Sequence, residues 1–111
     1  MDPKMEECLK DCMECYKSCT MMITHCLEMG GEHASPEHIN LLKDCAEICK
    51  LSVDFMLRDS EFAAQLCKLC VEICAQCTKQ CEQMAGDDEM MKACAETCRK
   101  CADACQEMAG V

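Results

Sequence analysis

Apolar side chains recur along the chain at alternating steps of three and four residues, the period of an α-helix with one buried face. The pattern runs through four segments separated by glycine, proline or short polar stretches, and no segment shows the alternation of a β-strand. It predicts helices over about residues 2–29, 36–57, 60–85 and 88–108. Because the loops are short, we expect an all-α fold, an antiparallel up-down-up-down four-helix bundle forming a single domain over residues 1–111.

Helix start signals support these boundaries. Pro3 suits a first helical turn, and Ser35 followed by Pro36 is a strong cap and first residue for the second helix. A short turn at residues 58–60 precedes the third helix, with Ser60 as its capping residue. Asp87 is the expected cap of the fourth helix.

Cysteine occupies most positions on the inner faces of the predicted helices. The 16 cysteines fall into four groups that follow the helical spacing, one group in each helix. Met22 and Met91 take further inner positions, and His38 lies seven residues before Cys45 on the same face. A bundle of these helices would have a cysteine-lined core. The cysteines are Cys8, Cys12, Cys15, Cys19, Cys26, Cys45, Cys49, Cys67, Cys70, Cys74, Cys77, Cys81, Cys94, Cys98, Cys101 and Cys105.

These thiols are poor core filler. Cysteine is often buried as a small hydrophobe, but 16 of them would leave voids that Leu or Ile would fill, at ~1 kcal/mol for each missing methyl-sized piece. The chain has few large side chains that could fill these voids, since only three of its residues are aromatic, one Tyr and two Phe. The composition therefore indicates that a soft metal fills the core.

A disulfide framework is a weak alternative. The first residues lack the apolar stretch of a secretory signal, and no apolar run approaches the length of a membrane span, so we expect a cytoplasmic protein with reduced thiols. Geometry points the same way. Neighbouring residues on one helical face have Cβ atoms about 5 to 6 Å apart, whereas a disulfide needs roughly 3.5 to 4.5 Å.

Charge and ligand type favour Cu(I) over other metals. About four Zn²⁺ in four-thiolate sites would leave roughly eight uncompensated negative charges among 16 thiolates, whereas Cu(I) near one per thiolate leaves the core close to neutral. Thiolates and thioethers both select Cu(I), and the inner-face Met22 and Met91 fit that preference. Iron–sulfur clusters usually gather cysteines through tight turns rather than along helices.

The two ends of the predicted bundle differ. One end, called here the His/Met end, holds the first and third loops and gathers neutral nitrogen and sulfur ligands, of which we expect His38 to bind metal. Weaker neutral ligands can pass an ion on to thiolates, so this end is the expected point of Cu(I) uptake. The His/Met end comprises Met22, His25, Met29, His33, His38, Met84, Met90 and Met91. The opposite end is expected to be a hydrophobic plug of Met5, Phe55, Met56, Leu57, Phe62 and Leu66.

The charge balance and the fold exclude several functions. The 21 acidic and 11 basic residues give a formal net charge of -10, which argues against nucleic acid or an anionic membrane as partner. A thiol redox enzyme would need a thioredoxin-like βαβ context, which the pattern lacks, so we expect no enzymatic turnover. A second apolar stripe on the third helix, which includes Phe62 and Leu69, suggests either self-association or cover for the bundle's flanks.

The cysteine ladder resembles that of the cytosolic copper storage proteins. The resemblance covers nearly the whole chain and rests on Cys8 to Cys26, residues 44–49, 59–60 and 66–74, and Cys94 to Cys105. It implies high-capacity storage of Cu(I) in multinuclear thiolate clusters within a homotetramer, with ion uptake at the His-bearing end. A copper chaperone or a copper-requiring recipient is a further expected partner.

This chain differs from the cytosolic copper storage proteins at the His/Met end. Met22, His38 and Met91 stand where close relatives of the family have further cysteines. The departure implies a somewhat lower capacity and an uptake site richer in neutral ligands. A metallothionein-like buffer that holds Zn²⁺ or Cd²⁺ in four-thiolate sites remains the alternative function.

Overall fold

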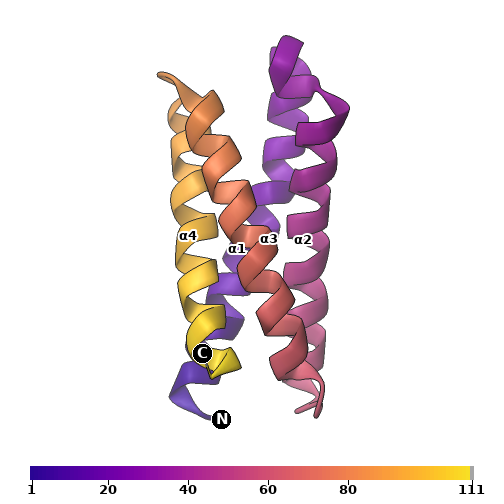
Figure 1. Cartoon of the computed structure of the whole chain (residues 1–111), viewed down its shortest axis with the longest axis vertical. Helices are drawn as coiled ribbons and strands as arrows, with labels where there is room; N and C mark the ends of the chain where they lie inside the picture. Colours follow the sequence, from indigo (N-terminus) through magenta and orange to yellow (C-terminus); the bar gives the residue numbers. More distant parts are fainter. Residues whose placement is uncertain (111) are drawn as a thin grey trace.

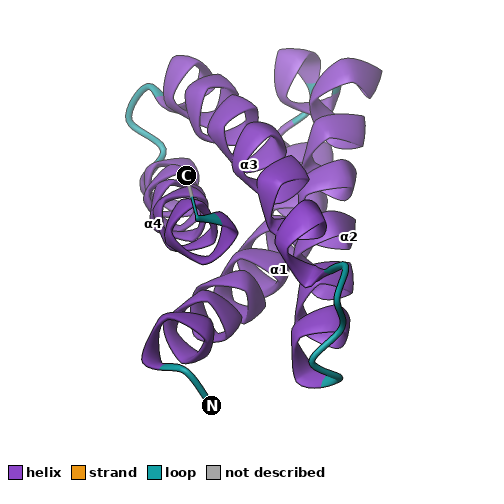
Figure 2. Cartoon of the chain, turned by 60° about the horizontal axis from the view of Figure 1, so that its bottom comes forward, coloured by secondary structure: helices purple, strands orange, loops and turns teal. Residues whose placement is uncertain are grey.

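The computed structural model describes residues 1–110 and contains four long helices (Figure 1). Helix α1 spans Pro3–Met29, α2 spans Pro36–Leu57, α3 spans Ala63–Ala85 and α4 spans Glu89–Ala109. A short 3-10 helix, η1, spans Gly31–Ala34 between the first two. Figure 2 shows that the remaining residues form short loops. Val111, the last residue of the expected domain 1–111, lies outside the described residues.

Side-chain caps begin three of the helices. Asp2 accepts a hydrogen bond from the backbone N–H of Lys4, and Ser35 accepts one from that of His38. The cap of α4 is Asp88 rather than the expected Asp87, because the Asp88 carboxylate is the group that accepts from the first backbone N–H groups of the helix.

Helix α3 begins three residues later than the sequence pattern suggests. The carbonyl of Ser60 accepts a hydrogen bond from the N–H of Ala63, and the Ser60 hydroxyl accepts one from the N–H of Phe62. These bonds form a turn, helped by the positive φ of 54° at Asp59, and the helix follows it. The change moves no cysteine, since Cys67 is the first one in this helix.

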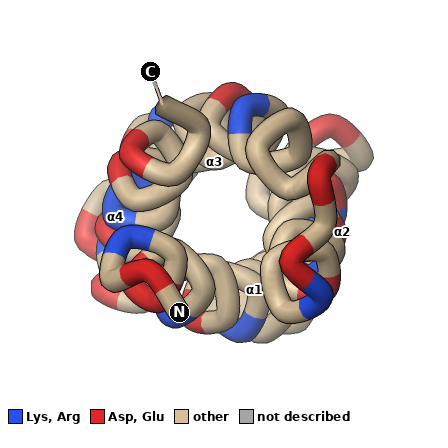
Figure 3. The backbone as a smooth tube through the Cα atoms, turned by 90° about the horizontal axis from the view of Figure 1, so that it is seen from below, with Lys and Arg blue, Asp and Glu red and all other residues tan. Residues whose placement is uncertain are grey.

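The four helices form a ring around a long axis. Helix α1 packs against α2 and α4, and α3 completes the ring by packing against the same two helices (Figure 3). Consecutive helices run antiparallel, so the N- and C-termini lie at the same end as the α2–α3 turn (Figure 1). The body measures 42 × 20 × 18 Å. The predicted all-α four-helix bundle is therefore confirmed.

Cysteines make up most of the residues in the core. All 16 cysteines are buried as free thiols on the inner faces. The backbone segments of Lys, Arg, Asp and Glu lie mostly on the outside of the ring in Figure 3. Hydrocarbon is scarce in the core, and Leu42 is the largest fully buried side chain. The cysteine-lined core predicted from the spacing is confirmed. Within residues 1–110, no helix combines the length and hydropathy needed to cross a bilayer.

The plug at the end opposite the His/Met end is smaller than predicted. Met56 is buried there, and Met5 and Leu66 are half-buried against the core. Leu57 and Phe62 are more than half exposed, so their assignment to the plug was wrong. Leu57 follows the inward-facing Met56 by one residue, or about 100° around the helix, and Phe62 lies in the turn before α3.

Candidate metal centre

The four inner faces bring their thiols together at common heights along the axis. At the first level, nearest the chain termini, the sulfur of Cys8 lies 3.6 Å from that of Cys105 and 4.0 Å from that of Cys67. The antiparallel pairing of α2 and α3 places Ser52 opposite Cys67, because Cys49 contacts Cys70 one step further along both helices. The first level therefore has three thiols and one hydroxyl.

The Ser52 hydroxyl is unusual within this core. Its Oγ is the one buried side-chain oxygen or nitrogen in residues 1–110 without a hydrogen-bond partner. Ser52 lies on the inner face of α2, where the other inward positions carry a sulfur, an imidazole or a leucine side chain.

The next two levels each contain four thiols, one from every helix. Sulfur–sulfur distances of 3.7 Å connect Cys49 to both Cys70 and Cys101 at the second level. At the third level, Cys45 lies 3.7 Å from Cys15 and 3.6 Å from Cys74. The second level comprises Cys12, Cys49, Cys70 and Cys101, and the third comprises Cys15, Cys45, Cys74 and Cys98.

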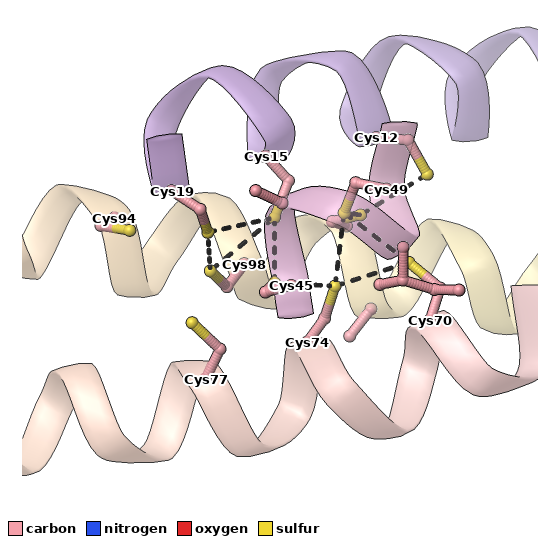
Figure 4. Packing of buried hydrophobic residues seen from close by; sticks show 14 of the residues in the cluster. Cys12, Cys15, Cys19, Cys45, Cys49, Cys70, Cys74, Cys77, Cys94 and Cys98 are labelled. Atoms are coloured by element: carbon pink, nitrogen blue, oxygen red, sulfur yellow. Dashed lines mark hydrogen bonds between the residues drawn. The ribbon is translucent and has the colours of Figure 1, made fainter. Parts of the chain in front are cut away.

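Contacts between the levels make one continuous sulfur network, and the dashed lines in Figure 4 show part of it. The sulfur of Cys105 lies 3.5 Å from that of Cys12, and Cys74 lies 3.8 Å from Cys49. Compact groups, whose sulfurs all lie within 4.8 Å of one another, overlap because they share cysteines. These groups are Cys8/Cys12/Cys105, Cys12/Cys49/Cys70/Cys101, Cys15/Cys45/Cys49/Cys74 and Cys15/Cys19/Cys45/Cys98.

The spacing of these sulfurs suits shared metal ions. Neighbouring sulfurs at 3.5 to 4.0 Å are too far apart for disulfides, whose sulfurs are about 2.05 Å apart. In a tetrahedral site with metal–thiolate bonds of about 2.3 Å, the sulfurs lie about 3.8 Å from one another. A cysteine that belongs to two groups could bridge two ions, so the network can hold a multinuclear cluster.

The sulfurs are more widely spaced toward the His/Met end. Cys26, Cys77, Cys81 and Cys94 lie outside the compact groups formed by residues 1–110, and Figure 4 shows the sulfurs of Cys77 and Cys94 apart from the dashed network. Larger side chains share this part of the core. They are Met22, His38, Leu42 and Met91, all buried.

Leu42 corrects the predicted inner face of α2. The inner face expected from the sequence passes directly from His38 to Cys45. In the structure Leu42 is fully buried between them, and Leu41 is half-buried. The inward positions from His38 to Ser52 are therefore separated by four, three, four and three residues. The same 3/4 rule that identifies Met22 would have found Leu42.

His38 is buried with both ring nitrogens occupied. Its Nε2 lies 3.4 Å from the sulfur of Cys26, and its Nδ1 lies 2.7 Å from Oε1 of Gln80. His38 therefore lies in the thiol core on the predicted inner face, and its role as a metal ligand stays a prediction. The contact with Gln80 was missed, because a glutamine one residue before Cys81 has no distinguishing pattern in the sequence.

The other predicted members of the His/Met end are arranged differently. Nε2 of His25 lies 2.7 Å from the Asp88 carboxylate, which ties α1 to the cap of α4. The contact with His25 lowers the pKa of Asp88, and backbone N–H donors at the start of α4 add to the effect. Met29 and Met90 are exposed and do not reach the core.

Hydrogen bonds among the thiols push their pKa values in opposite directions. Bonds from Cys101 and Cys19 lower the pKa of Cys15, whereas the bond to Cys15 raises that of Cys19. Cys26 lies outside this pattern, since burial is the main cause that raises its pKa to about 11. Its thiol is therefore protonated at neutral pH, so metal binding there releases a proton.

Comparisons with known proteins identify relatives of this arrangement. The family model described as "Copper storage protein" matches residues 1–110. The crystal structure of the Nmul_A1745 protein from Nitrosospira multiformis is 43% identical, with a TM-score of 0.92, over 99% of this chain and 98% of the other. The Cu(I)-bound copper storage protein BsCsp3 is 38% identical, with a TM-score of 0.87, over 96% and 98%.

A third solved structure shows a copper-loaded relative. The cytosolic copper storage protein from Streptomyces lividans, described with five coppers, is 28% identical with a TM-score of 0.84. The match covers 97% of this chain and 93% of that protein. Relatives with the same arrangement of four helices are therefore known in copper-bound form, one of them with five coppers.

Proposed function

Because this chain belongs to the copper storage protein family, we propose that it is a cytoplasmic, high-capacity store for Cu(I). The proposed ligands are its 16 cysteines together with Met22, His38 and Met91. The observation that carries the proposal is the continuous sulfur network, in which overlapping compact groups share Cys12, Cys15, Cys45 and Cys49. Shared thiolates allow many ions to occupy one core.

Charge supports Cu(I) as the stored ion. The buried thiols give up protons when metal binds, so a core of thiolates needs about one positive charge per sulfur to remain near neutral. Cu(I) supplies that charge with one ion for each thiolate, whereas Zn²⁺ in separate four-thiolate sites supplies about half of it. The sulfur spacing alone would accept either ion, and this keeps the zinc or cadmium buffer as the alternative.

The cellular setting and assembly form part of the same proposal. The family is one of metal storage rather than catalysis. Free buried thiols suit the reducing cytoplasm, and the Streptomyces lividans relative is described as cytosolic. We place the chain in the cytoplasm as a single-domain protein, assembled as a homotetramer, that exchanges copper with a chaperone or a copper-requiring recipient. Exposed Phe62 and Leu69 offer apolar surface for such contacts.

An anaerobic titration tests the stored ion. Reduced protein titrated with Cu(I) against a competing chromophoric chelator is expected to bind about 12 to 20 ions per chain tightly, since thiolates and thioethers select this ion. A parallel Zn²⁺ titration serves as the control. Saturation at about four ions, with zinc bound more tightly than copper, would replace the copper store by the zinc buffer.

Copper uptake through the His/Met end makes a separate prediction. Replacing His38 by alanine or Met91 by leucine removes a neutral ligand at that end and leaves the thiols in place. We expect uptake to slow by roughly tenfold or more, with little change in capacity. Losing one partner around a metal site commonly lowers metal affinity or activity by that order. Rates are measured by stopped-flow transfer from a Cu(I)–chelator complex.

The neighbouring Met90, which is exposed, provides the matched control. Met90→Leu is expected to load as fast as the unmodified protein. If His38→Ala and Met91→Leu also load at that rate, uptake does not pass through these residues. A fall in capacity without a change in rate would instead make them storage ligands only.

A further inference from the structure

The two neighbours of His38 determine which ring nitrogen carries the proton. A neutral imidazole has one N–H donor and one acceptor nitrogen. The Gln80 oxygen, 2.7 Å from Nδ1, can only accept a hydrogen bond, so Nδ1 carries the hydrogen and donates it. The lone pair of Nε2 then points toward the sulfur of Cys26 at 3.4 Å. The Cys26 thiol can donate its own hydrogen to that lone pair.

We propose that Gln80 is a positioning residue for copper uptake: its amide oxygen fixes His38 so that Nε2 and the Cys26 sulfur form a two-donor site for incoming Cu(I). This inference rests on the proposed function. Metal-binding histidines commonly donate their second ring N–H to an oxygen, which sets the tautomer and the ring orientation. With the opposite tautomer, His38 would present a hydrogen rather than a lone pair to the ion.

Three different helices hold the parts of this site in place. Cys26 lies in the last turn of α1, His38 in the first turn of α2 and Gln80 in the second half of α3. The His38 ring is 1% exposed, so it has little freedom to turn unless Gln80 moves. Because the His38 ring is so deeply buried, its contact with Gln80 determines the direction in which the Nε2 lone pair points.

Gln80 also reaches the surface of the protein. It lines a groove of about 360 Å³ together with Glu32, Glu37 and Met84. The two carboxylates would attract a cation, and the Met84 thioether is a soft ligand for Cu(I). The groove thus brings an ion next to the residue that orients His38. When Cu(I) binds the Cys26 sulfur, the thiol proton leaves to solvent, and the ion then exchanges onto the stronger thiolate ligands of the core.

Nitrogen NMR of metal-free protein labelled with ¹⁵N at histidine tests the orientation without any substitution. At pH 8 the His38 signals are expected to report hydrogen on Nδ1 and none on Nε2. Gln80→Leu should give a mixture of the two tautomers. Gln80→Glu, which keeps an oxygen facing Nδ1, should restore the single tautomer. A hydrogen on Nε2 in the unmodified protein would overturn the proposal.

Uptake kinetics test the consequence. In stopped-flow transfer from a Cu(I)–chelator complex at pH 8, Gln80→Leu is expected to load about tenfold more slowly than the unmodified protein, with the same final capacity. Gln80→Glu should recover the rate. Gln83, an exposed residue of the same groove, supplies the matched control Gln83→Leu, which should load normally.

The outcomes separate this inference from the proposed function. Loading of Gln80→Leu at the normal rate, in a protein that still fills with Cu(I), would overturn the role of Gln80 and leave the copper store intact. Failure of the unmodified protein to bind many Cu(I) ions would overturn the store itself. A slow Gln83→Leu variant would indicate that the whole groove matters rather than the bond to His38.

Discussion

Replacing Leu42 by alanine is expected to lower the free energy of unfolding of the metal-free protein by about 2 to 5 kcal/mol, the usual range for a fully buried leucine. Leu42 is completely buried and belongs to a core cluster made mostly of cysteines. The core contains little other hydrocarbon that could close over the cavity. The loss should therefore fall in the upper part of that range.

Urea denaturation followed by circular dichroism measures this loss. Leu51→Ala is the matched control, because Leu51 lies in the same helix with 43% of its surface exposed. A surface change of this kind is expected to alter stability by no more than about 0.5 kcal/mol. Equal losses in the two variants would mean that the metal-free core is loose around Leu42 rather than close-packed.

The fold was predictable because one residue type marks every inner face. Cysteine spacing marks the buried side of each of the four helices, and the structure buries each of the 16 thiols. The start of α3 was less predictable, since residues 60–62 carry both a capping serine and an apolar residue. Backbone hydrogen bonds of the turn, which the pattern cannot show, decide that Phe62 stays outside the helix.

The candidate site was predictable to a different degree at its two ends. Helical spacing and antiparallel order predict levels of thiols such as Cys45 and Cys74, which lie 3.6 Å apart. At the His/Met end, spacing identifies His38 but says nothing of what its ring contacts. Contacts such as His38–Gln80 and His25–Asp88 depend on how polar side chains from different helices meet. A residue's own position on its helix does not determine these partners.

The unequal spacing of the sulfurs gives the two ends different chemistry. Compact groups around Cys12, Cys15, Cys45 and Cys49 hold sulfurs already close enough to share an ion. The His/Met end mixes isolated thiols with thioether and imidazole, which bind Cu(I) without adding negative charge. An ion taken up at this end, as we propose, would meet neutral ligands first and thiolate-rich groups afterwards. This order favours movement into the core, because each step offers more anionic sulfur.

Loading with Cu(I) is expected to raise the stability of the folded protein far above that of the metal-free form. Each ion that binds only the folded state adds about 4 kcal/mol when free copper exceeds its dissociation constant by 1,000-fold. Several such sites together exceed the 5 to 15 kcal/mol typical of a whole domain. The loaded protein should resist urea concentrations that fully unfold the metal-free protein, and a strong chelator should reverse the effect.

The metal-free protein should nevertheless remain a helical bundle. Helix caps such as Ser35 and Asp88 need no metal, and neither does the packing of Leu42, Ile48 and Val53. Protonated thiols are small hydrophobes that can be buried without a charge penalty. Circular dichroism before and after copper removal checks this expectation. Loss of helical signal on removal would mean that copper drives folding, whereas an unchanged signal with a lower urea midpoint would mean that copper fills a core already formed.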